Sequence, residues 1–214
     1  MKVSSFPLIL FQVNCYVVYD PVEKKAAIVD PGIVDNREVE NIDRFLRDNS
    51  LEVVAIINTH QHIDHVLANS GLAAKYAVPV MAHPDDAFLG DRLKDQAREF
   101  GLPFRIENAG VTHYLKDGDI IPIGSGSLEV IHLPGHSPGG IGLYDAKDGF
   151  LLTGDTLFQG SVGRTDLPGG DMGRLLESIR KRLYSLPDDT IVYPGHGPAT
   201  TIAREKQSNP FLRQ

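Results

Sequence analysis

Residues 53–65 read VVAIINTHQHIDH, a short apolar run that leads directly into three histidines and an aspartate. The run is rich in β-branched side chains, which predicts a strand from Val53 to Asn58. A strand end and the loop beyond it can direct several side chains into one cleft, and His60 and His62 can project the same way in extended backbone. This segment therefore predicts a polar site at one end of a buried strand.

The four polar side chains of this segment are potential metal ligands. Neutral imidazole and carboxylate are the ligands that borderline ions such as Zn²⁺ prefer, and the segment offers four of them within six residues: His60, His62, Asp64 and His65. Buried without a metal, these groups would repel one another or lack partners, at a cost on the order of several kcal/mol. We therefore expect a metal site, with a solvated loop as the alternative.

Three further candidates follow other predicted strands, each flanked by Gly or Pro: His136, Asp155 and His196. The sequence PGHSP at 134–138 recurs as PGHGP at 194–198, so the turns that carry His136 and His196 resemble each other. Two metal ions need about three protein ligands each and a shared group. Seven candidates, one of them a carboxylate left over to bridge, fit a dinuclear site.

The remaining pattern is mixed α and β. Strands are predicted for the N-terminal stretch to Phe11 and for 15–19, 26–30, 53–58, 78–82, 128–133, 150–153 and 190–193. Helices are predicted around Val39, Ile42 and Leu46 after a capping box of Asp35 and Glu38, and around Leu175, Ile179 and Leu183 after Asp171. Residues 117–153 indicate consecutive hairpins, with the plainest turn at 124–126. We expect one domain, 1–214, with a mixed sheet.

Composition excludes several classes of function. The formal net charge is −7, and Lys and Arg are scattered, which argues against a nucleic-acid partner. No apolar run reaches the roughly 18 residues of a membrane span, so we expect no membrane partner. The single cysteine, Cys15, cannot form an internal disulfide, which favours a reducing, cytoplasmic location. Its apolar strand favours a buried structural thiol over a nucleophile.

The segment Thr-His-X-His-X-Asp-His at 59–65, with the later His136, Asp155 and His196, resembles the signature of the metallo-β-lactamase-fold hydrolases. Within them the chain resembles the glyoxalase II-like (hydroxyacylglutathione hydrolase-like) branch, at 14–16, 29–32, 153–158, 163–166 and 209–212. The resemblance implies a four-layer αββα sandwich with two mixed sheets inside and a site at one edge. Full-length glyoxalase II enzymes carry a further C-terminal helical region, whereas eighteen residues follow His196 here, which implies the single-domain branch.

The resemblance also implies roles for the seven residues. His60, His62 and His136 would hold a first divalent ion, whereas Asp64, His65 and His196 would hold a second, and Asp155 would bridge the two. Zinc is the expected ion, with iron or manganese as alternatives. Hydroxide formed between the ions would attack a small-molecule thioester or ester, and Asp64 would help to orient it, so Asp64 and Asp155 are the catalytic candidates.

Three residues outside the signature have two interpretations each. Asp30 can fix a ligand imidazole from behind or simply form the turn before Pro31 and Gly32. Arg164 can anchor a substrate carboxylate, with Asp166 beside it at the pocket, or the two can pair with each other to shape their loop. His83, His113 and His132 are assigned to surface or core.

Other functions compete with thioester hydrolysis. The sequence GRTD at 163–166 also resembles a segment of the persulfide dioxygenases, in which His60, His136 and Asp155 would hold one iron. A lactonase or a β-lactamase would share the same metal cluster, and a metal-binding scaffold without turnover is the third class. The oligomeric state is not readable from the sequence.

Overall fold

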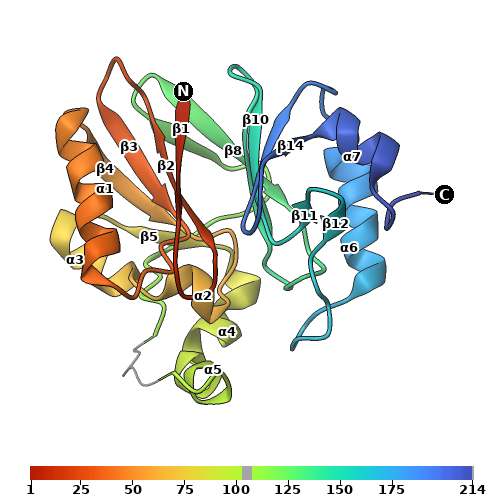
Figure 1. Cartoon of the computed structure of the whole chain (residues 1–214), viewed down its shortest axis with the longest axis horizontal. Helices are drawn as coiled ribbons and strands as arrows, with labels where there is room; N and C mark the ends of the chain where they lie inside the picture. The colour runs from red at the N-terminus through yellow and green to blue at the C-terminus, as the bar shows by residue number, and fades with distance from the viewer. Residues whose placement is uncertain (103–107, 214) are drawn as a thin grey trace.

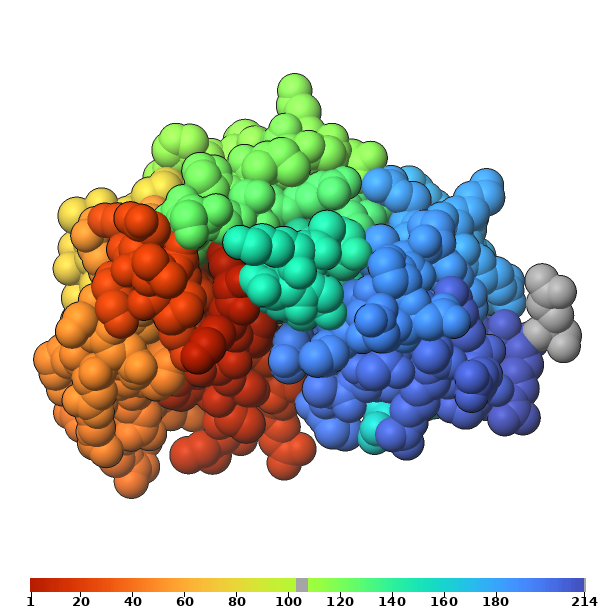
Figure 2. Space-filling model, turned by 90° about the horizontal axis from the view of Figure 1, so that it is seen from above, coloured from red at the N-terminus to blue at the C-terminus, as the bar shows by residue number. Residues whose placement is uncertain are grey.

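The computed structural model describes residues 1–102 and 108–213. In this part of the chain two six-stranded sheets face each other, with α1 and α3 on the outer side of one and α6 and α7 on the outer side of the other (Figure 1). The predicted four-layer αββα sandwich is therefore confirmed. Seen from above, the first strands and the C-terminal segments form two neighbouring halves of the molecule (Figure 2).

The first sheet contains strands from the N-terminal half in chain order: β1 (Lys2–Pro7), β2 (Asn14–Tyr19), β3 (Lys25–Val29), β4 (Glu52–Ile57), β5 (Val80–Ala82) and β6 (His113–Tyr114). Strands β1 to β3 pair antiparallel, whereas β3 to β6 pair parallel. The parallel part places the ends of β3, β4 and β5 at the same edge of the sheet.

The second sheet has the order β14-β13-β10-β9-β8-β7. Its strands are β7 (Ile120–Ile123), β8 (Gly126–His132), β9 (Ile141–Asp145), β10 (Phe150–Gly154), β13 (Ile191–Pro194) and β14 (Thr200–Thr201). Only β10 and β13 pair parallel, so this sheet is mixed as well. A separate two-stranded hairpin follows β10 and consists of β11 (Leu157–Phe158) and β12 (Ser161–Val162).

Helices connect and cover the sheets. They are α1 (Asn36–Asp48), α2 (Ile63–Val66), α3 (Asn69–Tyr76), α4 (Ala87–Asp91), α5 (Leu93–Glu99), α6 (Met172–Ser178) and α7 (Ile202–Ser208), with a 3₁₀ turn at Pro84–Asp86 and a π-helical turn at Ile179–Leu183. The predicted capping box is present at the start of α1. The side chain of Asp35 accepts from the backbone N–H of Glu38, and the side chain of Glu38 accepts from the backbone N–H of Asp35. None of the helices in the described ranges is long and apolar enough to cross a membrane.

The central strands are buried on both faces. Alternate residues such as Val18, Ala27 and Ile57 face the second sheet, whereas Ile28 and Ile56 pack on the other side with α1. Strands covered on both faces carry continuous apolar runs, and these runs are what made the strands predictable.

Several predicted boundaries differ from those of the structure. The N-terminal strand stops at Pro7 instead of Phe11, because Leu8 N–H donates to the carbonyl of Val13 and closes a hairpin loop. The fifth strand begins at Val80, not at residue 78, and the helix predicted through Leu183 leaves α-helical geometry after Ser178. Within this loop Leu8 is buried in the core, Ile9 and Leu10 are exposed, and Phe11 lines the pocket described below.

Candidate metal centre

Segments that follow four strands meet at one edge of the sandwich. The loop after β4 carries His60 and His62, and α2 carries Asp64 and His65. The other three side chains follow β8, β10 and β13, and they are His136, Asp155 and His196. All seven predicted residues are thereby brought together, in overlapping groups whose potential ligand atoms lie within 4.8 Å of one another.

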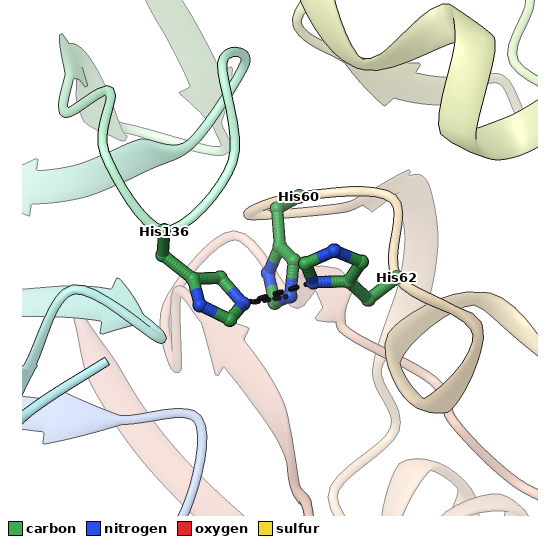
Figure 3. Close-up of side chains that lie close together, drawn as sticks. All are labelled: His60, His62 and His136. Carbon is green, nitrogen blue, oxygen red and sulfur yellow. Dashed lines mark hydrogen bonds between the residues drawn. The ribbon is translucent and has the colours of Figure 1, made fainter. Parts of the chain in front are cut away.

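Three imidazoles form one half of the site (Figure 3). His136 Nε2 lies 2.9 Å from His62 Nδ1 and 3.2 Å from His60 Nε2, so nitrogen atoms from two separate loops point at one another. All three side chains are buried. We call this group, His60, His62 and His136, the imidazole half.

Hydrogen bonds behind two of these rings fix where their protons lie. His136 Nδ1 donates to the carbonyl oxygen of Arg164 at 2.7 Å, which leaves Nε2 with its lone pair toward the site. The hydroxyl of Thr59 donates to Asp30 Oδ2 at 2.6 Å, so its oxygen can accept from His60 Nδ1, which lies 3.2 Å away. Both rings therefore present an unprotonated Nε2 to the centre.

In the other half, histidine rings lie against carboxylates. His196 Nε2 lies 3.3 Å from Asp64 Oδ2, and His65 Nε2 lies 3.6 Å from the same oxygen. Asp155 is between the two halves, because its oxygens lie 3.5 Å from His65 Nε2 and 3.6 Å from both His136 Nε2 and His196 Nε2. We call Asp64, His65 and His196 the carboxylate half.

The two halves have opposite electrostatics. Burial, and then the neighbouring rings, hold the pKa of His60 well below its usual value and lower the pKa of His62 to about 3. Burial also disfavours charge on His65, but Asp64, Asp30 and Asp155 outweigh it and raise its pKa to about 10. Burial would raise the pKa of Asp64, yet His65 and His196 hold it below its usual range.

The protein alone does not satisfy these polar groups. Among the described residues, His62 Nε2, His65 Nε2 and Asp155 Oδ1 are buried and have no hydrogen-bond partner. Because His136 Nε2 and His60 Nε2 are both unprotonated, their lone pairs face each other across 3.2 Å with no donor between them. Converging lone pairs beside carboxylates suit a divalent metal ion, and the donor set therefore fits one.

A pocket of about 480 Å³ opens beside the centre. Its wall includes side chains of both halves, the apolar Phe11, Phe100 and Phe158, and the cationic Arg92 and Arg164. The Arg164 side chain is paired with Asp166 through two hydrogen bonds of 2.7 Å, so the mutual pairing foreseen for this loop is present. Arg164 is still half exposed and lines the pocket.

Asp30 has both of its predicted roles, because it lies against an imidazole and also forms the turn before Pro31. Its Oδ1 accepts from Thr59 N–H at 2.8 Å, and its Oδ2 lies 3.1 Å from His65 Nδ1. Its backbone takes a positive φ of 52° and its carbonyl accepts from Gly32 N–H, which forms the turn. Thr59, which connects Asp30 to His60, was not singled out from the sequence, although it stands inside the signature.

The remaining candidates lie away from the pocket wall. Cys15 is fully buried, and burial raises the pKa of its thiol, so the thiol stays protonated. His83 stacks on His132 with centroids 4.2 Å apart, whereas His113 lies in the exposed strand β6. Sequence reasoning also missed Asp86, a buried carboxylate on the 3₁₀ turn, because nothing local distinguishes it from the neighbouring Asp85.

Comparison with known proteins agrees with this geometry. Residues 8–196 match the family described as the metallo-beta-lactamase superfamily. The hydroxyacylglutathione hydrolase GloC of Haemophilus influenzae is 40% identical over 213 residues, which cover 99% of this chain and 98% of that protein. A crystal structure titled BLEG-1 B3 metallo-beta-lactamase has a TM-score of 0.89 at 38% identity and full coverage of both chains. TTHA1623 in a di-iron-bound form has a TM-score of 0.85 at 38% identity, covering 98% of this chain and 100% of that one. This chain is therefore a metallo-hydrolase of the metallo-beta-lactamase superfamily.

Proposed function

We propose that this protein is a thioesterase of the hydroxyacylglutathione hydrolase type. It uses two divalent cations, for which zinc is the expected metal, to hydrolyse a small-molecule thioester. The observation that carries the proposal is the pair of ligand sets that share Asp155 beside a pocket. The similarity to GloC over nearly the whole length of both proteins supports thioester chemistry.

The proposed ligands are His60, His62 and His136 for one ion and Asp64, His65 and His196 for the other, with Asp155 shared. Two bound cations supply Lewis acidity, which lowers the pKa of water from about 15.7 toward 7 and polarises a carbonyl oxygen. The thiol of Cys15 does not compete as a nucleophile, because it is buried and protonated.

The protein's own groups prepare the site for hydrolysis. Asp64 stays ionised, since His65 and His196 lower its pKa, so it can accept a hydrogen bond from the attacking water and orient it. The carbonyl of Arg164 holds the ring of His136, and Asp30 holds Thr59 and lies against His65. These contacts keep the proposed ligands oriented before substrate arrives.

The pocket supports a substrate with an apolar part and a polar part. Phe11, Phe100 and Phe158 offer apolar surface, whereas Arg164 offers a cation at the same wall. A thioester whose acyl or thiol group carries a carboxylate would place that group near Arg164, where it competes with Asp166 for the guanidinium.

Elemental analysis of the protein as purified, followed by thioester assays, tests the proposal. We expect close to two metal ions per chain and release of free thiol from S-lactoylglutathione, with loss of activity after chelation and recovery when zinc is added back. A protein that holds two ions but cleaves no member of a thioester panel would contradict the proposed activity.

The same geometry gives two other reactions a definite test. His60, His136 and Asp155 converge, so one iron held by two histidines and a carboxylate is sterically feasible. One iron per chain, with oxygen uptake on a glutathione persulfide, would favour the dioxygenase. The similarity to BLEG-1 makes lactam and lactone hydrolysis the second alternative, and both belong in the substrate panel.

A further inference from the structure

The two loops that carry the proposed imidazole ligands come from different sheets. A contact between them is needed to fix the distance from one loop to the other. His60 and His62 lie on the loop after β4, whereas His136 lies on the loop between β8 and β9. Their ring nitrogens are held 2.9 to 3.2 Å apart. A shift of one loop relative to the other by about an ångström would change the ligand geometry of the imidazole half.

One buried carboxylate bonds to both loops at once. Asp86 Oδ2 accepts from the backbone N–H of Gln61 at 3.2 Å, and Gln61 stands between His60 and His62. The same oxygen accepts from Ser137 Oγ at 2.8 Å, directly after His136. Asp86 Oδ1 accepts from Gly139 N–H at 2.6 Å.

The loop around His136 is fitted closely to this carboxylate. A Cβ atom at Gly139 would lie 2.7 Å from both Asp86 Cγ and Asp86 N, so no larger residue could occupy this position without moving the loop. Asp86 itself has an exposed fraction of 0%. A buried carboxylate is costly unless donors surround it, and here donors of both loops do so.

A second contact holds the same elements together. His83, which caps the 3₁₀ turn of Asp86, stacks on His132 at 4.2 Å with the rings 8° from parallel. His132 Nε2 bonds in turn to the carbonyl of Pro138 at 2.9 Å. His83 Nδ1 accepts from Asp85 N–H at 3.2 Å, so each ring also uses a nitrogen atom in a contact that holds these elements in place.

We propose that Asp86 is a positioning residue of the metal centre, which sets the distance between the loop of His60 and His62 and the loop of His136. The inference rests on the proposed metal ligation, and it does not depend on which substrate the enzyme takes. Asp86 does not reach the metal ligands themselves. It acts through the backbone of Gln61 and Gly139 and through the hydroxyl of Ser137.

Zinc affinity of Asp86→Ala, measured by competition with a chromophoric chelator, tests the proposal. Loss of an outer contact of this kind costs about 10- to 100-fold in metal affinity, and we expect a value in that range. Asp86→Asn keeps one acceptor oxygen and should fall between Asp86→Ala and the unmodified protein. Ser137→Ala removes one of the three hydrogen bonds and should weaken binding by only a few-fold.

Asp20 offers a matched control. It is also buried, and it accepts from the backbone of Val22, Glu23 and Ser125 and from the Ser125 hydroxyl. It lies in the turn before β3, at the opposite end of that strand from the metal centre. Asp20→Ala and Asp86→Ala should each lower the thermal midpoint by several degrees, but Asp20→Ala should leave zinc affinity within about two-fold.

Equal zinc affinity in Asp86→Ala and the unmodified protein would overturn the proposal, and so would an equal loss in Asp20→Ala. The proposed thioesterase activity is tested separately from the role of Asp86. A protein that binds zinc and loses affinity in Asp86→Ala, yet hydrolyses no thioester, would support the role of Asp86 and overturn only the activity.

Discussion

The imidazole half and the carboxylate half of the metal centre control charge in opposite ways. In the imidazole half, burial keeps His60 and His62 neutral, so their lone pairs are free at any ordinary pH. In the carboxylate half, Asp64 and Asp155 attract a proton to His65 and raise its pKa to about 10. A cation meets ready ligands in the first half, whereas it must displace a proton in the second.

The difference shows two ways to prepare a metal site before metal arrives. Neutral rings carry no charge that would draw them together, so they must be held by outer contacts such as the bond from His136 to the carbonyl of Arg164. Carboxylates instead provide an attractive field that favours a cation over a neutral site. We therefore expect the imidazole half to depend more on positioning and the carboxylate half more on pH.

Asp155 belongs to both halves, so its loss should have the largest effect. Asp155→Ala removes the carboxylate that lies 3.5 to 3.6 Å from His65, His136 and His196. We expect kcat/KM for a thioester to fall about 10³-fold, which corresponds to roughly 4 kcal/mol, and the metal content to fall. Steady-state kinetics with elemental analysis measures both. Retention of two ions and full activity would show that Asp155 is not shared.

Removing one ligand from each half compares the halves directly. We expect His62→Ala and His196→Ala each to retain about one ion and to lose about 10²- to 10³-fold in thioester hydrolysis, because two-metal chemistry needs both. A chemistry that uses one iron at His60, His136 and Asp155 predicts a different result. In that case His196→Ala would keep activity within a few-fold, and the hydrolase interpretation would fail.

In metal-free protein, the two halves should change the free energy of unfolding with pH in opposite directions. His60 and His62 have lowered pKa values in the folded state, so the unfolded chain binds more protons below about pH 6.5 and stability falls as the pH decreases. His65 has a raised pKa of about 10, so its contribution is complete below about pH 6.5 and is lost as the pH rises toward 10.

Urea unfolding of chelator-treated protein between pH 5 and 9 measures this profile. We expect a maximum near neutral pH, with slopes on the order of 1 kcal/mol per pH unit on each side. Bound zinc replaces the proton near His65 and should remove the alkaline decline. A metal-free profile that rises steadily to pH 9 would contradict the charge assigned to the carboxylate half.

The sequence predicted the metal centre better than its surroundings. His60 to His65 stand together in the chain after a buried strand, and the turns of His136 and His196 carry similar Gly-Pro patterns, so local sequence indicated them as candidates, whereas their division into two ligand sets came from the resemblance. The strands were predictable because burial on both faces leaves continuous apolar runs. The hairpin pattern at 117–153 predicted a mixed sheet, whereas the two sheets and four layers came from the resemblance, since the packing of sheets depends on contacts distant in sequence.

Contacts between distant segments account for what was missed. Asp86 meets Gln61 across 25 residues and Ser137 across 51, and no local pattern encodes such a pairing. The strand predicted to Phe11 failed for a related reason, because Leu8 pairs with Val13 in a turn and Phe11 lines the pocket, and the apolar run encodes neither contact. The two roles of Arg164 were left open for a local reason, because its pairing with Asp166, two residues away, depends on the backbone conformation of their loop.

Arg164 provides the smallest and most selective test, because its backbone and its side chain serve different parts of the site. The carbonyl oxygen holds His136, whereas the half-exposed side chain pairs with Asp166 and lines the pocket. Arg164→Ala keeps the carbonyl, so zinc affinity and kcat should change little. An exposed ion pair contributes about 0 to 1 kcal/mol, so stability should change by no more than that.

The expected effect of Arg164→Ala is therefore confined to KM, which should rise a few-fold for thioesters that carry a carboxylate and stay constant for uncharged ones. Asp166→Ala is the matched variant, because it frees the guanidinium and should lower KM for the carboxylate-bearing substrates. If both substitutions leave every KM unchanged, Arg164 only shapes its loop. The imidazole half would then receive its support from this segment through one carbonyl oxygen alone, and the side chain would add nothing to substrate binding.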